Sequence, residues 1–346
     1  MYRKIFTIAC TLPLMAAYGQ NMSAASAAAS EGAGTLSQRI GHFDRSKTRV
    51  LVQTHDGAGT MQVMSILRGK SLSTPFLGLD EAIIDPGGGL GEHFHNDCEE
   101  MFMAIDGPDA QFTINSHTSV LKTPAGAPNR MGSSHGFYNP TDKPILWLDF
   151  MVGNLSRYHD GFNLGDDRVG APLDKVPQFV NFHMDPALLK PIANMYGGTG
   201  TVMYRRLLDP GVFLTPWSYT DEISIPAGAS IGPVTDPIMS EVYFVLSGTG
   251  TVTINGETAS IKQNDAIPVD LDQTYSLTQT GAEPLHLLVN GIAKDQLSKE
   301  AFIERPETMA VGMLRAGTPP PCMQGSTRPN GTGPCVLTKT PPQPSR

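Results

Sequence analysis

Three side chains that commonly bind metal ions lie close together between two glycine-marked turns. His93, His95 and Glu100 fall between Gly87 and Gly107. Alternate side chains of a β-strand point to the same face, so His93 and His95 project together, as two imidazoles must if they bind one ion. Glu100 lies five residues after His95 and can reach the same ion from the next part of a sheet. The spacing predicts half of a metal site, built on strands.

A later strand is expected to supply a fourth ligand, and His135 is the best candidate for it. Three imidazoles and one carboxylate suit a borderline divalent transition metal, which we expect to be Fe, Mn, Ni, Cu or Zn. Glu100 is also the natural proton acceptor of such a site if its bond to the metal is labile.

The spacing of these residues resembles the cupin superfamily. Its first motif, G-x5-H-x-H-x4-E-x6-G, is matched at every position by Gly87, His93, His95, Glu100 and Gly107. The second motif, G-x5-P-x-G-x2-H-x3-N, is matched in part: His135 and Asn139 have its spacing, but eight residues separate Gly126 from His135 where the family has two. The resemblance implies an all-β fold of double-stranded β-helix, or jelly-roll, barrels with a metal held by His93, His95, Glu100 and His135.

An internal repeat indicates two copies of this unit. A shift of 141 residues aligns Gly87 with Gly228 and Gly107 with Gly248, and a shift of 140 then aligns Thr113-Ile114-Asn115 with Thr253-Ile254-Asn255. We therefore predict a bicupin with two tandem barrels. The expected segments are an N-terminal barrel over 36–152, a connector over 153–195, a C-terminal barrel over 196–292, and a short helix with a Pro/Gly-rich tail over 293–346.

The two copies differ at the metal-binding positions. The counterparts of His93, His95, Glu100 and His135 are Val234, Asp236, Glu241 and, with a gap of two residues, Gln273. Valine cannot bind a metal, and the other three side chains form a weak, oxygen-only set. We expect one metal site, in the N-terminal copy. The second copy then serves as structural support or binds a different, metal-free ligand.

Composition and charge agree with an all-β protein that acts on small molecules. The 346 residues include 36 Gly and 28 Pro, and the apolar runs between them are short, which favours strands. Early strands are expected at Met61–Leu67 and Ala82–Ile84, a closing strand at Pro144–Val152, and short helices at Pro186–Leu189 and Asp295–Ile303. A net charge of -8 without a basic block argues against nucleic acid as a partner.

The N-terminus predicts export. Tyr2-Arg3-Lys4 precedes an apolar run from Ile5 to Ala17, which is typical of a signal peptide and too short to span a bilayer. We expect a signal over 1–19, a disordered linker over 20–35, and a periplasmic or secreted protein that does not associate with the membrane once the signal is removed. Cys322 and Cys335 can form a disulfide or remain as thiols, and Cys98 is expected to be a small buried or turn residue.

Other polar residues near the motifs have two interpretations each. Arg130, just before His135, is a candidate substrate anchor or a surface residue. Six histidines outside the motif are expected to be surface or core residues and not ligands, with His117 exposed in a hairpin turn. These are His42, His55, His117, His159, His183 and His286.

Three classes of function fit this pattern. The first is a dioxygenase that acts on a small oxygenated organic molecule, similar to secreted bicupin flavonol dioxygenases, and we favour it narrowly. The second is an isomerase, epimerase or lyase-pathway enzyme acting on sugars or sugar acids. The third is a non-enzymatic metal- or ligand-binding cupin, which the intact ligand set disfavours. An oxalate decarboxylase is less expected, because those bicupins usually carry ligands in both copies. Cupins often associate, so a homo-oligomer is also expected.

Overall fold

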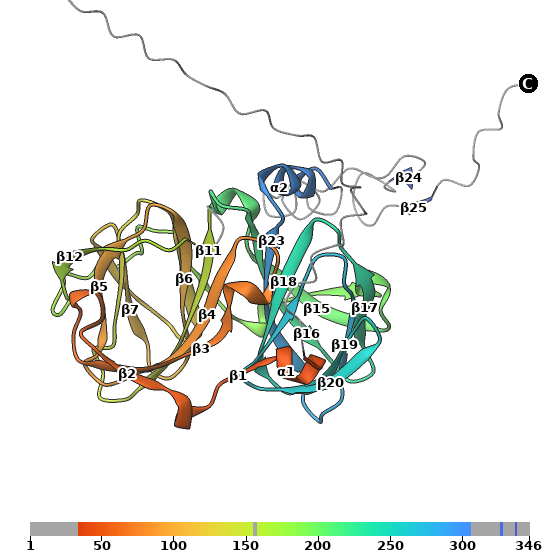
Figure 1. Cartoon of the computed structure of the whole chain (residues 1–346), viewed down its shortest axis with the longest axis horizontal. Coiled ribbons are helices and arrows are strands. Elements are labelled where there is room, and N and C mark those ends of the chain that lie inside the picture. The colour runs from red at the N-terminus through yellow and green to blue at the C-terminus, as the bar shows by residue number, and fades with distance from the viewer. Residues whose placement is uncertain (1–33, 155–157, 306–325, 328–335, 338–346) are drawn as a thin grey trace, which may run out of the picture.

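The chain folds into two similar β-domains that lie side by side (Figure 1). The computed structural model describes residues 34–154, 158–305, 326–327 and 336–337. Within these residues there are two short α-helices, α1 (Leu36–Arg39) and α2 (Gln296–Ile303), and no helix is long and apolar enough to cross a membrane. The predicted signal peptide and both cysteines of the tail lie outside the described residues, as does nearly all of the predicted linker.

The first domain consists of a seven-stranded and a five-stranded antiparallel sheet. The larger sheet has the order β13-β9-β6-β11-β4-β3-β2, and the smaller has the order β12-β5-β10-β7-β8. The strands are β2 (Arg49–Val52), β3 (Thr60–Arg68), β4 (Phe76–Ile84), β5 (Gly89–Phe94), β6 (Cys98–Asp106), β7 (Ala110–Ile114), β8 (His117–Leu121), β9 (Ala125–Asn129), β10 (His135–Tyr138), β11 (Ile145–Gly153), β12 (Phe162–Asp166) and β13 (Phe182–His183).

The second domain repeats this arrangement. Its seven-stranded sheet has the order β1-β21-β18-β23-β16-β15-β14, and its four-stranded sheet has the order β17-β22-β19-β20. The strands are β1 (Gly41–His42), β14 (Lys190–Ala193), β15 (Thr201–Leu208), β16 (Trp217–Ile225), β17 (Ser230–Thr235), β18 (Met239–Ser247), β19 (Thr249–Ile254), β20 (Glu257–Lys262), β21 (Asp265–Val269), β22 (Thr274–Gln279) and β23 (Leu285–Ala293), with a separate pair β24 (Ser326–Thr327) and β25 (Val336–Leu337).

Short 3-10 turns connect the strands. They are η1 (Arg45–Lys47), η2 (Thr54–Asp56), η3 (Gly69–Ser71), η4 (Pro186–Leu188), η5 (Met195–Gly197) and η6 (Pro210–Val212). The predicted helix at Pro186–Leu189 is the single turn η4, whereas the helix predicted at Asp295–Ile303 is α2. Asp295 caps α2 by accepting a hydrogen bond from the backbone N–H of Ser298 at 2.8 Å. The three strands expected in the first domain are present as β3, β4 and β11.

The structure confirms an all-β fold in two copies but moves the predicted domain boundaries. Leu36 and Ile40, expected in the first domain, are buried in the core of the second, and β1 pairs with β21 there. The predicted connector over 153–195 is divided between the domains. Its strands β12 and β13 extend the two sheets of the first domain, and β14 forms an edge of the second.

The domains join through the outer faces of their seven-stranded sheets. On β6, Phe102 and Ala104 belong to the core of the first domain, whereas Met101 and Met103 belong to a second core shared with strands of the other domain. This alternation explains why β6 is buried on both faces. Trp217, stacked on Phe213 with ring centroids 4.2 Å apart, is one of the largest side chains of the shared core.

Candidate metal centre

The four residues predicted to bind a metal meet between the two sheets of the first domain. His93 is on β5, His95 follows that strand, His135 is on β10 and Glu100 is on β6. His93 and His135 are direct partners in the β5–β10 pair, so their side chains share one face. One ligand atom from each of the four residues lies within 4.8 Å of the others, and all four side chains are buried.

Backbone carbonyls hold the three imidazoles in one orientation. Nδ1 of His93 is 2.8 Å from the carbonyl oxygen of Gly91, and Nδ1 of His135 is 3.2 Å from that of Ser133. Nδ1 of His95 contacts the carbonyl oxygen of Asp160. A carbonyl only accepts hydrogen bonds, so each Nδ1 carries a proton. Each Nε2 is then the ring atom available to the site, as a donor to Glu100 when it is protonated and as a lone pair for a metal when it is not. This is the outer support that metal-binding histidines usually have.

Glu100 lies where the Nε2 atoms converge. Its carboxylate oxygens are 3.1 Å from Nε2 of His135 and 3.4 Å from Nε2 of His95. Within the described part of the chain, the buried Nε2 of His95 has no hydrogen-bond partner. An orphaned imidazole nitrogen beside a buried carboxylate and two further imidazoles is a donor set that fits one divalent transition metal.

Electrostatics favour the ligand-competent forms of two of these groups. Burial alone would raise the pKa of Glu100, but the charge of His95 and hydrogen bonds from the surrounding imidazoles hold that pKa well below its usual range. The pKa of His93 is lowered to about 2, chiefly by burial and also by the neighbouring His135 and His55. Glu100 is therefore ionised and His93 neutral over the ordinary pH range, as metal binding requires.

Two histidines that we expected to be surface or core residues lie in the site. Nε2 of His159 is 3.1 Å from Glu100, and the His159 side chain is 42% exposed. The ring of His55 stacks on His93 with centroids 3.7 Å apart and a 5° interplanar angle. His55 adopts a left-handed backbone conformation with φ of 53°, which is uncommon for a residue other than glycine. The sequence did not indicate that either histidine borders the candidate metal centre, and the prediction that neither is a ligand stays a prediction.

Long-range pairing brings these two histidines to the site. β12 pairs with β5, with Asn163 opposite His93, so the segment that precedes β12 covers the imidazoles. The Asn163 side chain also forms a hydrogen bond with Nδ1 of His55 at 2.9 Å. Neither histidine belongs to a spaced motif, so no local signal in the sequence marks them.

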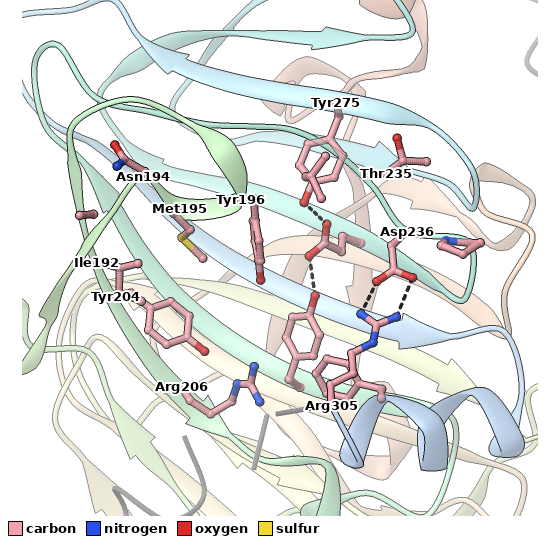
Figure 2. A pocket seen from close by; sticks show the side chains of 16 residues that line it. Ile192, Asn194, Met195, Tyr196, Tyr204, Arg206, Thr235, Asp236, Tyr275 and Arg305 are labelled. Carbon is pink, nitrogen blue, oxygen red and sulfur yellow. Dashed lines mark hydrogen bonds and ion pairs between the residues drawn. The ribbon is translucent and has the colours of Figure 1, made fainter. Parts of the chain in front are cut away.

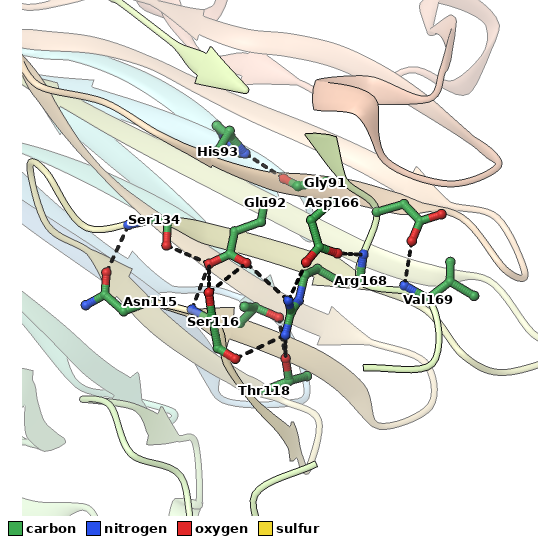
Figure 3. Close-up of polar contacts among 12 residues, drawn as sticks. Gly91, Glu92, His93, Asn115, Ser116, Thr118, Ser134, Asp166, Arg168 and Val169 are labelled. Atoms are coloured by element: carbon green, nitrogen blue, oxygen red, sulfur yellow. Dashed lines mark hydrogen bonds and ion pairs between the residues drawn. The ribbon is translucent and has the colours of Figure 1, made fainter. Parts of the chain in front are cut away.

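A buried polar network fixes the strands that carry His93 and His135 (Figure 3). Glu92, next to His93, accepts hydrogen bonds from the backbone N–H of Ser116 at 2.7 Å and from the hydroxyl of Ser134 at 2.6 Å. The guanidinium of Arg168 lies 3.2 Å from Glu92 and 2.7 Å from Asp166 on β12. The network therefore ties β5, the turn before β10 and β12 together behind the site.

Arg130 and Cys98 occupy different environments. Arg130 is exposed, and its charge acts on the ammonium of Lys299 in α2, whose pKa is lowered to about 8 chiefly by burial. Its predicted role as a substrate anchor stays a prediction. Cys98 is buried, as expected, and burial raises the pKa of its thiol. Its Sγ lies within 4.8 Å of ligand atoms of His95, Glu100 and His159, and these four residues form a second group that could hold a metal ion.

The second domain has the same geometry with different side chains. Val234 is paired with Tyr275 as His93 is paired with His135, and Tyr275 stands opposite Ile254 as His135 stands opposite Ile114. Tyr275 is therefore the counterpart of His135, and the assignment of Gln273 was wrong. Gln273 instead accepts a hydrogen bond from the backbone N–H of Asp270 at 2.9 Å.

The remaining histidines have structural partners or are exposed. His42 contacts Asp265 at 2.6 Å, and His286 contacts Glu222 at 2.9 Å. His117 lies at the start of β8 with its side chain 54% exposed, as the hairpin prediction required. His183 is exposed on β13.

Comparison with known proteins places the chain in a family. Residues 222–290 match the cupin domain. An oxalate-binding protein of Thermotoga maritima is 30% identical over 97 residues, which are 28% of this chain and 80% of that protein. The chain belongs to the cupin superfamily.

Solved structures extend the likeness to both domains. The oxalate decarboxylase of Lactobacillus farciminis, in a formate complex, has a TM-score of 0.52 at 16% identity and covers 74% of this chain and 86% of its own. A variant salicylate 1,2-dioxygenase of Pseudoaminobacter salicylatoxidans, in complex with gentisate, has a TM-score of 0.51 at 17% identity. The match covers 71% of this chain and 76% of the dioxygenase chain. The chain is thus a bicupin, with the complete His/Glu set in its first domain.

Proposed function

We propose that this protein is a single-metal enzyme that oxidises a small organic acid with O2. The observation that carries the proposal is the group of three imidazoles, each held through Nδ1 with Nε2 directed toward the ionised Glu100. His93, His95, Glu100 and His135 would hold the ion, which would be Fe, Mn, Ni, Cu or Zn, with Fe and Mn best suited to O2 chemistry. The fold itself does not require this set, because the second domain has Val234 and Tyr275 at the positions of His93 and His135.

The charge of the site favours an anionic substrate. A divalent ion with three neutral imidazoles and one carboxylate keeps a net positive charge, which attracts a carboxylate in a buried setting. When bound, the metal supplies Lewis acidity and one-electron redox chemistry to an organic acid held beside it. The names of the similar proteins support this substrate class, since they include oxalate and salicylate enzymes.

His159 and Glu100 are the residues placed to move a proton. Nε2 of His159 contacts Glu100 while nearly half of its side chain faces solvent. An imidazole in this position can take a proton from an acidic hydroxyl of the substrate and release it to water. His55, stacked on His93, restricts that ring to one orientation and excludes water from its face.

The test combines metal analysis with O2 uptake. Protein purified without added metal is analysed for metal content, and O2 consumption is followed as salicylate, gentisate and oxalate are added in turn. We expect about one ion per chain and O2 uptake with one of these acids, both lost in His135→Ala and both kept in Gln273→Ala. One ion without O2 uptake, but with conversion of a sugar acid, would replace oxidation by isomerase chemistry. A protein without metal would contradict the proposal.

Export is part of the same proposal. The basic start and the apolar run from Ile5 to Ala17 support a signal peptide, and the four-ligand domain begins well after it. N-terminal sequencing of the mature protein from the periplasm or the medium should find residues 1–19 removed. Intact protein in the cytoplasm would contradict export.

A further inference from the structure

The second domain has a cavity where the first has its His/Glu set. The cavity has a volume of about 610 Å³, within the usual range for sites that bind small molecules. Val234, Asp236, Glu241 and Tyr275, the counterparts of the four metal-binding residues, all line it. Figure 2 shows Tyr196, Tyr204 and Arg206 pointing toward the same open space. The second domain therefore has an open cavity at the position that the candidate metal centre occupies in the first domain.

The carboxylates of this cavity are engaged by protein groups. Glu241 accepts hydrogen bonds from the hydroxyls of Tyr219, Tyr243 and Tyr275. Asp236 is bound by both terminal nitrogens of Arg305, at 2.6 and 3.1 Å. Neither carboxylate is free to hold a metal, so the site is one for an organic ligand.

Ion pairs along the wall leave little net charge for a ligand. Arg206 pairs with the buried Asp221 and Arg305 pairs with Asp236. Burial raises the pKa of Glu241, while the hydrogen bonds from Tyr219, Tyr275 and Tyr243 act in the opposite direction. An anion would meet two arginines already neutralised by carboxylates, and would lose its hydration without gaining a strong partner.

A cationic ligand is also disfavoured. Aromatic faces attract cations, but the guanidinium of Arg206 already lies 4.6 Å from the centroid of Tyr219. Arg206 and Arg305 both lie over Phe302, at 5.8 and 5.5 Å. A further cation would find the aromatic faces of Tyr219 and Phe302 already covered by guanidinium groups.

The lining suits a ring with a hydrogen-bond donor. Apolar side chains supply much of the wall, among them Ile192, Met195 and Val234. Oε1 of Glu241 accepts a hydrogen bond from Tyr219, and a carboxylate oxygen can accept two such bonds. A ligand hydroxyl can therefore donate to it, while the apolar wall leaves the many hydroxyls of a sugar unsatisfied.

We propose that the second domain binds an uncharged aromatic alcohol, of the phenol class, in this metal-free cavity. The site is independent of the metal centre of the first domain. Its occupancy therefore does not depend on the proposed oxidation.

Isothermal titration of the full chain tests the proposal, with 2-naphthol as the probe. 2-Naphthoate, which has the same rings with a negative charge, and glucose are the comparison ligands. Val234→Phe fills the cavity, and Ala193→Trp blocks it from the exposed edge strand β14. Val120→Phe is the matched control on an exposed position of the first domain, and His93→Ala removes a ligand of the metal centre.

We expect one 2-naphthol per chain, at least about tenfold weaker binding of naphthoate, and no measurable binding of glucose. Affinity for naphthol should fall by about tenfold or more in Val234→Phe and Ala193→Trp and stay unchanged in Val120→Phe and His93→Ala. If Val234→Phe fails to fold, the naphthol affinity of Ala193→Trp alone tests whether the cavity is the binding site. The proposal is overturned by absent naphthol binding, by full affinity in Ala193→Trp, by equal or tighter binding of naphthoate or glucose, or by loss of binding in His93→Ala.

Discussion

Glu99 and Glu100 are neighbours on β6 with opposite tasks, and single substitutions should separate them. Glu100 faces the metal centre, whereas Glu99 is fully buried toward the second domain. Its carboxylate accepts hydrogen bonds from the backbone N–H groups of Leu214 and Thr215, at 2.9 and 2.8 Å, and from the Thr215 hydroxyl at 2.7 Å. These bonds join the domains at the segment that follows η6.

Glu99→Ala leaves three donors without this acceptor, and Thr215 is itself fully buried. At about 1.5 kcal/mol for each lost bond, the lower end of the range for bonds to a charged group, the variant should lose about 4–5 kcal/mol of unfolding free energy. For a protein of this size that corresponds to a fall in Tm of about 6 °C. The metal donors are untouched, so metal content should stay at the parent level.

Calorimetry and metal analysis of Glu99→Ala and Glu100→Ala provide the assay. Glu100→Ala should lose metal with a smaller change in the Tm of the metal-free protein. Glu99→Gln, which keeps one acceptor oxygen, should fall between Glu99→Ala and the parent. A Tm of Glu99→Ala within about 2 °C of the parent would refute the reasoning on the domain contact. Loss of metal in Glu99→Ala would refute the assignment of Glu99 to the domain contact and of Glu100 to the candidate metal centre.

Three further predictions concern a buried acid, the site and the shared core. Burial, with a smaller contribution from Asp265, raises the pKa of Glu81 to about 8, and within the described residues neither of its oxygens has a hydrogen-bond partner. The unfolded carboxyl ionises near its ordinary pKa of 4.5, so stability should fall as pH rises from about 4.5 to 8. Glu81→Gln should remove this pH-dependent loss of unfolding free energy, which is worth at most about 5 kcal/mol at pH 8. Denaturant unfolding measures the loss, and a variant with the same pH profile as the parent would contradict the prediction. His159→Ala should keep the metal but lower kcat by about tenfold or more, so loss of metal would make His159 a ligand. Trp217→Ala should cost about 3–5 kcal/mol in thermal or chemical unfolding, and a cost below about 1 kcal/mol would show that the shared core repacks.

The four residues of the candidate metal centre could be predicted because most of them lie close together in the sequence. His93, His95 and Glu100 lie within eight residues, and the alternation of a strand already places two of them on one face. To predict His135 as the fourth residue, it was enough to expect one further strand, β10, beside β5. His159 and His55 reach the site through the pairing of β12 with β5 and a left-handed turn, and neither leaves a periodic trace in the sequence.

The second domain shows where register reasoning failed. The 140-residue shift that relates Ile114 to Ile254 continues unchanged into β10 and β22, and so relates His135 to Tyr275. A two-residue gap was placed where the structure has none. The first domain boundary failed for another reason: β1 contributes two residues to a neighbouring sheet, and Leu36 and Ile40 enter a distant core. Such short, long-range contacts have no sequence pattern of their own.

Counting metal ions in a structurally matched pair of variants tests the central claim most directly. His93 and Val234 occupy the same place in the two domains. Elemental analysis of folded protein should find about one ion per chain in the parent and in Val234→Ala, and almost none in His93→Ala. Full metal content in His93→Ala, or loss of metal in Val234→Ala, would contradict a single metal centre in the first domain.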